Sequence, residues 1–441
     1  MRERVLFLVA CAALWGGPAR VAFAQPAGGD QQRLFEQMVQ QPANYELTLK
    51  FVGVATANGD YEAAIGALER LLFYNPDLPQ VKYQLGALYF RLGSYDMANR
   101  YFHEALASRN LDSATKGRIE TYLSSSEKQL QQNRLSGLVQ GGLRYQSNAN
   151  YGPSGDMVRL GGLDLALLPQ STHQPDGSTY TIVGLSDDYD LNEQRGDVLE
   201  TRLAAYDSHQ FRFDDLNVDL FDLSIGPRMP IGSPSLNGAT IKPYVVGGSD
   251  WVGGARYLSS AGAGLEAGIP LGPRWTVQPL VEWRYADYAT NVGTPTASFA
   301  TGNAYSGGFI STVKLSDDLA FESRTYYRRG TASFDFQSYY QWAQSAALTI
   351  SFAPLVKSSP YQWSLAPYAR YIRTAFDAAN PYIDPNVAQL DNEWTGGVVL
   401  TAPLDGTFGL SATVQYDYTA STLPNYELRD FSVMAGPTAR F

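Results

Sequence analysis

The sequence contains little of what thiol-dependent enzymes and helical membrane proteins are built from. It has one cysteine and three histidines in 441 residues, and only 17% of its residues are charged. Because 44% of the residues are hydrophobic, the chain is not intrinsically disordered, a state that requires low hydrophobicity and high charge. Beyond residue 16 no run of about 18 uncharged apolar residues occurs, which excludes a helical membrane protein. The net charge of −10 predicts no nucleic-acid partner.

The abundant residues are tyrosine (29), glycine (41) and aromatic residues in general (13%). Many aromatic and small residues with few charges are typical of β-rich chains, and of outer-membrane barrels in particular. The length leaves room for two or three domains.

Residues 1–24 have the features of a signal peptide. Two arginines and an apolar stretch from Val5 to Trp15 precede Ala22-Phe23-Ala24, which matches the small-residue cleavage pattern. The residues before Cys11 also resemble a lipoprotein cleavage box, but almost no apolar segment precedes them. We therefore expect an exported chain that loses Cys11 and has no thiol, disulfide or cysteine metal ligand.

A helical repeat with a period of 34 follows the signal peptide. Gly59-Asp60-Tyr61-Glu62-Ala63-Ala64 returns as Gly93-Ser94-Tyr95-Asp96-Met97-Ala98. The period and the residue types resemble the tetratricopeptide repeat. The second copy has the expected residue types at Leu85, Gly86, Tyr89, Gly93, Tyr95, Ala98, Phe102 and Ala105. A third helical pattern, 113–132, is predicted to cap the stack.

We therefore expect residues 25–133 to form a short periplasmic tetratricopeptide α-solenoid. Such a stack offers a concave groove to a protein substrate or chaperone. If the resemblance holds at each position, this groove is lined by Tyr83, Ala87, Phe90, Leu49 and Thr56. The alternative is that these side chains, Tyr83 and Phe90 above all, only pack between helices.

From about residue 134 the period changes to two. In Trp275–Tyr285 the odd positions are apolar with aromatic residues at both ends, and the even positions are mostly polar or charged. At ~3.3 Å per residue and a tilt of ~45°, this strand would rise roughly 23 Å, close to the apolar height of an outer-membrane barrel. A soluble sandwich also shows alternation, but it needs no aromatic belts and no terminal aromatic residue such as Phe441.

The pattern predicts an antiparallel transmembrane barrel of about 14 strands over residues 134–441. The expected strands begin near Leu135, Thr179, Val198, Asn217, Ala239, Ala255, Trp275, Ala304, Ala320, Tyr339, Trp363, Trp394, Thr407 and Tyr426. Short turns at 316–318 and 405–406 should face the periplasm, and longer connections at about 147–178, 287–303, 377–392 and 419–425 should face outside. Pro279, Pro243 and Pro367 conflict with this pattern, because proline cannot donate to a β-ladder, so we expect a bulge or weak pairing there.

Charged residues on the polar strand faces should line the lumen. Glu-x-Arg occurs three times, and a spacing of two puts both side chains on one face. The expected lumen residues are Arg144, Glu200, Arg202, Glu282, Arg284, Glu322, Arg324, Arg328 and Arg370, joined by Glu266, Glu393, Asp417 and Arg440. They either line the path of a translocating chain or brace the lumen as ion pairs. Their mixed signs disfavour a channel for a charged polysaccharide, but not for a neutral one.

Nothing in the chain indicates catalysis. His173 and His209 are isolated in sequence, and no triad, metal-ligand or acid–base spacing is present. We therefore expect no enzyme, no cofactor and no metal. The apolar segment 160–168 lies in the long first connection, where it either extends a hairpin above the membrane or folds inward as a plug.

Taken together, a signal peptide, tetratricopeptide repeats and a C-terminal barrel resemble the surface lipoprotein assembly modifier (Slam) family. The junction at 141–150, with Tyr145, Asn148 and Asn150, and the terminal Phe441 also carry the resemblance. It implies an outer-membrane protein that helps lipoproteins reach the cell surface, with outer-membrane lipid and the barrel assembly machinery as partners. The helical part is shorter than in that family. The alternative is an exopolysaccharide export porin, which also joins such repeats to a barrel.

Overall fold

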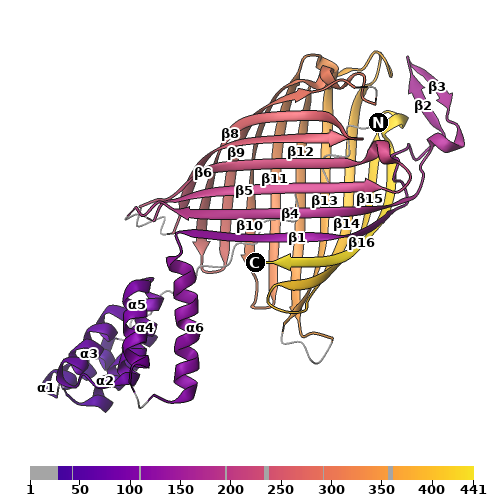
Figure 1. The fold of residues 1–441 in the computed structure, drawn as a ribbon. Coiled ribbons are helices and arrows are strands. Elements are labelled where there is room, and N and C mark those ends of the chain that lie inside the picture. Colours follow the sequence, from indigo (N-terminus) through magenta and orange to yellow (C-terminus); the bar gives the residue numbers. More distant parts are fainter. Residues whose placement is uncertain are drawn as a thin grey trace. The chain divides into compact units, whose positions relative to one another are not determined.

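The computed structural model describes residues 28–41, 43–108, 111–193, 196–232, 238–291, 293–355 and 361–441. Within these ranges the residues up to Arg134 form a compact helical unit, and the residues from Leu135 onward form a β-barrel (Figure 1). The expected signal peptide lies outside the described residues. In the part of the chain that the structure describes, no helix is both long and apolar enough to cross a bilayer.

The helical unit contains two helical hairpins that repeat at the predicted period. Its helices are α1 (Gly28–Gln40), α2 (Tyr45–Ala57), α3 (Tyr61–Tyr74), α4 (Pro79–Arg91), α5 (Tyr95–Leu106) and α6 (Ser113–Leu130). The first residues of α2 and α4 are 34 positions apart (79 − 45), as are those of α3 and α5 (95 − 61). The turn glycines Gly59 and Gly93 have φ of +78° and +76°, a left-handed conformation that favours glycine.

Small residues allow the helices of the second hairpin to pack closely. Gly86 and Phe102 are both fully or nearly fully buried, and a Cβ atom on Gly86 would collide with the Phe102 ring. α3 and α6 begin with side-chain caps, because Asp60 and Asp112 accept hydrogen bonds from the backbone N–H groups of Ala63 (3.2 Å) and Thr115 (2.8 Å). The backbone hydrogen bond from Thr115 also lowers the pKa of Asp112.

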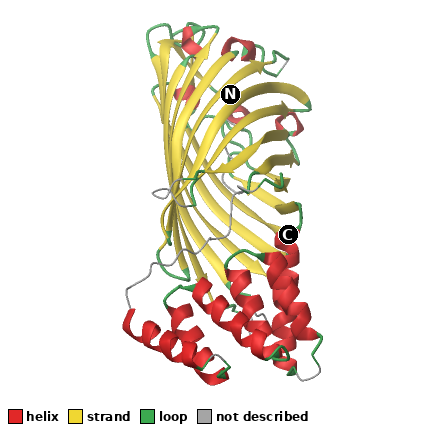
Figure 2. Ribbon diagram, turned by 90° about the vertical axis from the view of Figure 1, so that its left-hand side faces the viewer, coloured by secondary structure: helices red, strands yellow, loops and turns green. Residues whose placement is uncertain are grey.

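The barrel is closed and antiparallel, and it has the predicted fourteen strands. They are β1 (Asn133–Gln146), β4 (Asp176–Asp190), β5 (Val198–Gln210), β6 (Val218–Pro230), β7 (Thr240–Val252), β8 (Ala255–Gly272), β9 (Trp275–Tyr288), β10 (Gly302–Lys314), β11 (Leu319–Ala332), β12 (Tyr339–Phe352), β13 (Trp363–Ala379), β14 (Ala388–Pro403), β15 (Phe408–Ser421) and β16 (Leu428–Arg440). Each barrel strand pairs with its neighbours in the order of the chain, and β16 pairs with β1 to close the barrel. Figure 2 shows the strands curving around the barrel.

The expected strand starts agree with the structure to within three residues, with one exception. β14 begins at Ala388 rather than near Trp394, because the polar segment 388–393 continues the ladder with β13. The predicted short turns, 315–318 and 404–407, lie at the barrel end that contains Asn133 and Phe441, which we call the inner end. The long connections 147–175, 289–301, 380–387 and 422–427 all lie at the opposite, outer end.

Each proline within a strand interrupts one of that strand's two ladders. The β8–β9 ladder skips Pro279, although Pro279 keeps its place opposite Phe309 of β10. Pro367 interrupts the ladder to β12 but not that to β14, and Pro243 interrupts the ladder to β6 but not that to β8. The register is the same on both sides of each gap. Weak pairing, rather than a bulge, therefore accommodates these prolines.

The outward face of the barrel is apolar and carries aromatic residues at two levels. On β9, Trp275 and Trp283 are 46% and 42% exposed, and they lie roughly 26 Å apart along the strand. Phe441 is 54% exposed, so these side chains do not form the dry centre of a sandwich. An even number of antiparallel strands with an apolar outer band between two aromatic levels is the architecture of an outer-membrane barrel.

The apolar segment 160–168 forms a hairpin rather than a plug. Strands β2 (Met157–Leu160) and β3 (Leu163–Ala166) pair with each other outside the barrel sheet, and Leu163 is 68% exposed. Arg159 ties the hairpin to the outer connections: it contacts Asp164 at 2.8 Å and Asp384 at 3.1 Å. The hydrogen bond to Arg159 lowers the pKa of Asp164.

Candidate functional site: the barrel lumen

A buried charge cluster lines the lumen near the inner ends of β5 to β8. The carboxylate of Glu200 accepts from Lys242 Nζ at 2.9 Å and from Arg228 Nε, and it forms an ion pair with Arg202, whose Nε lies 2.5 Å away. Glu266 accepts from Arg202 Nη1 at 2.9 Å and from Arg228 Nη2 at 2.7 Å. Lys242 is 1% exposed and Glu200 is 4% exposed, so water solvates little of either charge. Two carboxylates therefore pair with three cations on one wall.

The cluster continues toward mid-lumen through Tyr244. The Lys242 ammonium lies 5.5 Å from the centre of the Tyr244 ring, and the Tyr244 hydroxyl donates to Glu282 at 2.9 Å. Arg284 Nε then donates to Glu282 at 2.6 Å, and Arg284 also pairs with Asp222. We call the connected set the β5–β9 network. Its members are Glu200, Arg202, Asp222, Arg228, Lys242, Tyr244, Glu266, Glu282 and Arg284.

Close curvature and glycines allow the network to form. Neighbouring strands lie ~4.8 Å apart, so β5 and β8 are about 14 Å apart along the sheet, yet Arg202 and Glu266 touch. The side chains therefore cross the concave inner surface. Gly264 stands opposite Tyr244 in the ladder, and a Cβ atom there would collide with the Tyr244 ring. Without glycine at this position, Tyr244 would be displaced from Glu282.

The facing part of the lumen is lined by hydroxyl and amide groups together with Arg370 and Asp417. Tyr368 Oη donates to Gln415 at 2.5 Å, and Thr395 Oγ1 donates to Asp417 at 2.7 Å. Arg370 Nη2 donates to Thr395 Oγ1 at 3.1 Å, and Gln341 Nε2 donates to Thr374 at 3.0 Å. We call this surface the β12–β15 wall; its named members are Gln341, Tyr368, Arg370, Thr374, Thr395, Gln415 and Asp417. These bonds join strands one or two positions apart.

The charged residues predicted for the lumen lie on the strand faces opposite the exposed aromatic and aliphatic side chains. The Glu-x-Arg pairs 200/202 and 282/284 enter one network, whereas Arg324 and Glu322 contact each other locally at 2.7 Å. Arg328 donates to Ser306 at 3.2 Å and stacks on the Tyr326 ring at 5.2 Å. Which of these residues a translocating substrate contacts stays a prediction.

Four members of the network are not predicted from the sequence: Asp222, Arg228, Lys242 and Tyr244. A signal was present for Asp222, because the alternating neighbours Phe221 and Leu223 are apolar and point outward. Pro227 and Pro243 sit beside Arg228 and Lys242 and hid the strand pattern there.

The asparagine-rich junction organises the entry of the first outer connection. Asp430 of β16 accepts from Gln146 (3.1 Å), Ser147 (3.0 Å) and the backbone N–H of Asn148 (2.9 Å). Asn148 and Asn150 then hold the loop backbone at Gly152 and Thr172. Tyr151 has φ of 50° and packs against inward Tyr180 and Tyr206. The predicted lumen residue Arg144 is 6% exposed and donates to Tyr206 at 3.4 Å.

His209 is not isolated in space, contrary to its position in the sequence. His209 Nε2 lies 2.9 Å from Asp207, and Asp219 of β6 lies opposite Asp207 in the ladder. Their ligand atoms lie within 4.8 Å of one another. The spacing of two between Asp207 and His209 on one strand was the available signal. These outward side chains are chemically capable of holding a divalent cation.

In the helical unit, the predicted groove residues lie in different surroundings. Tyr83 and Phe90 are half-buried, and their rings contact Tyr122 of α6 at centroid distances of 6.3 and 5.1 Å. Leu49 packs against the core of the first hairpin, and Ala87 and Thr56 are half-buried. In the unbound chain Tyr83 and Phe90 pack between helices, as the alternative prediction stated. Their role in partner binding stays a prediction.

A carboxylate also joins two tyrosines in the helical unit. Glu69 accepts from Tyr89 at 2.8 Å and from Tyr101 at 3.2 Å, and the two rings stack at 5.6 Å. Burial, and then the hydrogen bond to Glu69, raise the pKa of Tyr89 to about 12.

The solved structures that align with this chain do so at low identity and low TM-score. No protein-family model matches the chain, and no curated protein matches it. Among solved structures, a Pseudomonas aeruginosa FadL homologue aligns over 72% of this chain and 91% of its own, with 10% identity and a TM-score of 0.38. A bacterial polysaccharide outer membrane secretin aligns over 69% and 98%, with 9% identity and a TM-score of 0.33. MamA MSR-1 C2 aligns over 23% of this chain, which spans 55% of that structure, with 22% identity and a TM-score of 0.20.

Proposed function

We propose that this chain is an outer-membrane translocation and assembly factor that helps deliver lipoproteins or related substrates to the cell surface. The helical unit acts in the periplasm, where it binds a protein substrate or a chaperone. The barrel provides the path across the outer membrane. The observation that carries the proposal is the union, in one chain, of a repeated helical hairpin with a barrel whose lumen presents charges of both signs.

The balanced lumen supports a polypeptide substrate. A polypeptide carries both signs of charge, so a lumen of one sign would repel part of every segment that passes. In the β5–β9 network Glu200 and Glu266 neutralise the adjacent arginines, and Glu282 and Asp222 neutralise Arg284. Such a wall neither attracts nor repels a passing chain strongly.

The aromatic content of the helical unit supports a protein partner. Tyr83 and Phe90 are half-exposed in a cluster with Tyr122, and aromatic side chains are the usual anchors of helical peptide-binding surfaces. Ala87 lies between them in the sequence. By the resemblance to tetratricopeptide repeats, a bulky side chain of the partner would enter the groove at this small residue.

The test is protease accessibility of lipoproteins on intact cells. Deletion of the gene should remove specific lipoproteins from the surface while their total amounts stay unchanged. The wild-type chain should restore exposure, and Ala87→Arg should not, because it puts a charge into the predicted groove. Phe73→Ala serves as the control, since Phe73 is 82% exposed outside that groove. Unchanged lipoprotein exposure in the deletion strain would contradict the proposal.

The barrel assembly machinery is the second proposed partner. Phe441 is exposed on the outward face, and its backbone exchanges hydrogen bonds with Gly137 of β1 (2.9 and 3.2 Å). Phe441→Ala should lower the yield of folded barrel, seen as loss of the heat-modifiable band, without affecting export. An unchanged yield would remove this partner from the proposal.

A second candidate function is export of a neutral polysaccharide. The inward tyrosines favour it, because Tyr244, Tyr326, Tyr339 and Tyr368 offer ring faces and hydroxyl groups beside polar partners. In that case deletion of the gene abolishes secreted polymer, and Tyr368→Ala lowers its yield. Normal polymer yield in the deletion strain would reject this candidate.

A further inference from the structure

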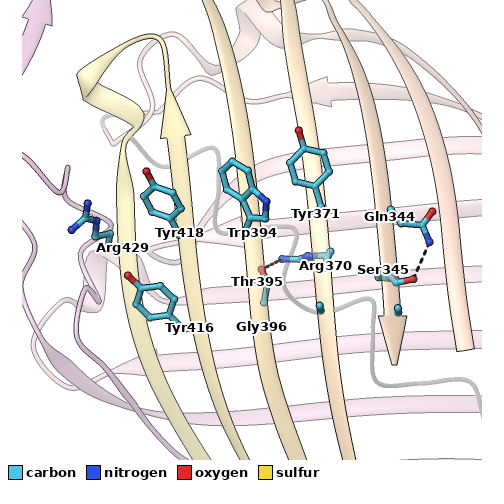
Figure 3. A pocket seen from close by; sticks show the side chains of 12 residues that line it. Gln344, Ser345, Arg370, Tyr371, Trp394, Thr395, Gly396, Tyr416, Tyr418 and Arg429 are labelled. Carbon is cyan, nitrogen blue, oxygen red and sulfur yellow. Dashed lines mark hydrogen bonds between the residues drawn. The ribbon is translucent and has the colours of Figure 1, made fainter. Parts of the chain in front are cut away.

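The outward face of β12 to β16 contains a groove with a volume of about 680 Å³. Its floor is a cross-strand row of small residues, in which Ala346 faces Ala369 and Ala369 faces Gly396. Tyr416 closes the row on β15. Ser345, Arg370 and Thr395 alternate with the floor residues and also line the groove (Figure 3). The floor residues share their side of the sheet with exposed Trp394 and Tyr416, so this side faces lipid.

An aromatic ledge borders the floor toward the outer end of the barrel. Tyr371, Trp394 and Tyr418 lie side by side on neighbouring strands, with ring centroids 5.3 and 5.6 Å apart (Figure 3). Trp394 remains 44% exposed. Indole and phenol rings at this level occupy the boundary between acyl chains and headgroups.

Basic side chains stand beyond the ledge. Arg429 lies over the Tyr418 ring at 5.6 Å, and Arg373 follows Tyr371 by two residues on the same outward face. Both are exposed, and among the described residues neither forms an ion pair. Arginine at the membrane boundary binds phosphate as a bidentate donor.

The other side of the groove is polar, although it faces lipid. Gln344 accepts from Thr325 Oγ1 at 2.6 Å and donates to Ser323 Oγ at 2.9 Å. Ser323 faces Ala346 in the ladder, so this polar group ends the same row of small residues. Polar side chains in a lipid-facing surface are costly unless they bind one another or a polar ligand.

We propose that this groove binds an anionic, phosphate-bearing lipid of the outer leaflet, with an acyl chain on the Ala346–Ala369–Gly396 floor and the phosphate at Arg429 and Arg373. The volume lies within the range of roughly 300–1,000 Å³ that is usual for small-molecule sites. The proposal is independent of what passes through the lumen, so a negative result here leaves the proposed function standing.

The test is competitive lipid retention by the purified full-length protein. The barrel is incubated in micelles that contain equal amounts of phosphatidylglycerol and phosphatidylcholine, and bound lipid is counted by native mass spectrometry. The wild type should retain phosphatidylglycerol about fivefold over phosphatidylcholine. Arg429→Gln with Arg373→Gln should bring this ratio near one. Arg256→Gln is the control, because Arg256 is equally exposed near the outer end of β8.

Filling the floor tests the position of the acyl chain. An added Cβ on Gly396 meets no atom within 4 Å, so Gly396→Val fills the groove without a clash. It should lower retention of both lipids severalfold. Independently, phosphatidylglycerol brominated on its acyl chains should quench the tryptophan fluorescence of the wild type more than that of Trp394→Phe. Equal retention of the two lipids by the wild type, unchanged retention in Gly396→Val, or equal quenching would each overturn the proposal.

Discussion

The two walls of the lumen use polar side chains in different ways. In the β5–β9 network, Glu200 and Glu266 bind cations that come from strands two and three positions away, and the charges are buried. On the β12–β15 wall, Thr395 binds Arg370 on the adjacent strand, and Gln415 binds Tyr368 two strands away. The first wall joins five strands through connected charges, whereas the second relies on hydroxyl and amide groups.

This difference separates structural charge from functional charge. A charge whose counter-ions surround it, such as Glu200, presents little field to a solute and mainly fixes the curvature of the wall. Arg370 on the β12–β15 wall is less buried than Glu200, so it keeps more of its field in the lumen. The β12–β15 wall is therefore the surface on which solute selectivity should depend.

The largest expected effect is loss of the Glu200 charge. Glu200→Gln leaves Arg202, Arg228 and Lys242 with one remaining carboxylate, and uncompensated buried charge should cost roughly 3 kcal/mol of unfolding free energy. Urea unfolding in lipid vesicles, followed by tryptophan fluorescence, measures it.

The matched variant on the other wall is Asp417→Asn. It should lower the free energy of unfolding by roughly 1 kcal/mol, because Asp417 accepts from neutral Thr395 and Gln415. Equal costs for the two variants would show that the network is no stronger than the local contacts.

The strands themselves could be predicted from the sequence, because side-chain alternation is a local property. Trp275–Tyr285 places its aromatic residues on one face whatever the neighbouring strands are. β14 was the exception. Asp391 and Asn392 lie on opposite faces and both are polar, so no alternation of apolar and polar residues marks the start of this strand.

The β5–β9 network could not be predicted, because its partners are set by curvature. Arg202 and Glu200 share a face by spacing alone, but contact between Arg202 and Glu266 requires β5 and β8 to approach across the inner surface. No local pattern in the sequence encodes that distance. The same holds for Tyr83 and Phe90, whose contacts depend on where α6 packs.

Paired tyrosines and glycines allow a sharper comparison of the two walls. Tyr244 lies over Gly264, and Tyr368 lies over Gly397. Valine at either glycine displaces a ring and its hydrogen bond. We expect Gly264→Val to lower the free energy of unfolding by roughly 2 kcal/mol, because Tyr244 loses a charged acceptor.

Gly397→Val should cost more than Gly264→Val, because a Cβ on Gly397 would also lie 2.7 Å from the backbone oxygen of Val414. The same urea titration ranks the two variants, and the reverse order would show that losing the charged acceptor of Tyr244 outweighs this backbone clash.

Ion selectivity should change when a charge is removed from the β12–β15 wall, and it should not change when a balanced pair of charges is removed from the β5–β9 network. Arg370→Gln removes a positive charge from the β12–β15 wall and should shift the permeability ratio of K⁺ to Cl⁻ about twofold toward K⁺. The double variant Glu282→Gln with Arg284→Gln removes one charge of each sign from the network and should leave the ratio unchanged. Reversal potentials across planar bilayers under a KCl gradient measure both. A larger shift in the double variant would reverse the roles assigned to the walls.

The smallest expected effect concerns Glu69 in the helical unit. Like Glu200, it accepts from more than one side chain, but its donors Tyr89 and Tyr101 are neutral. The pKa of Tyr89 is raised to about 12, above the ordinary value of 10, so the native state favours the protonated hydroxyl. The stability that comes from burial of the protonated hydroxyl and from its bond to Glu69 is therefore full below pH 10 and is lost as the pH rises from 10 to about 12. Tyr89→Phe keeps the ring and removes the titrating group. Helical circular dichroism during heating should show the wild type losing stability relative to Tyr89→Phe across that window, and parallel curves would mean that the bond to Glu69 contributes nothing.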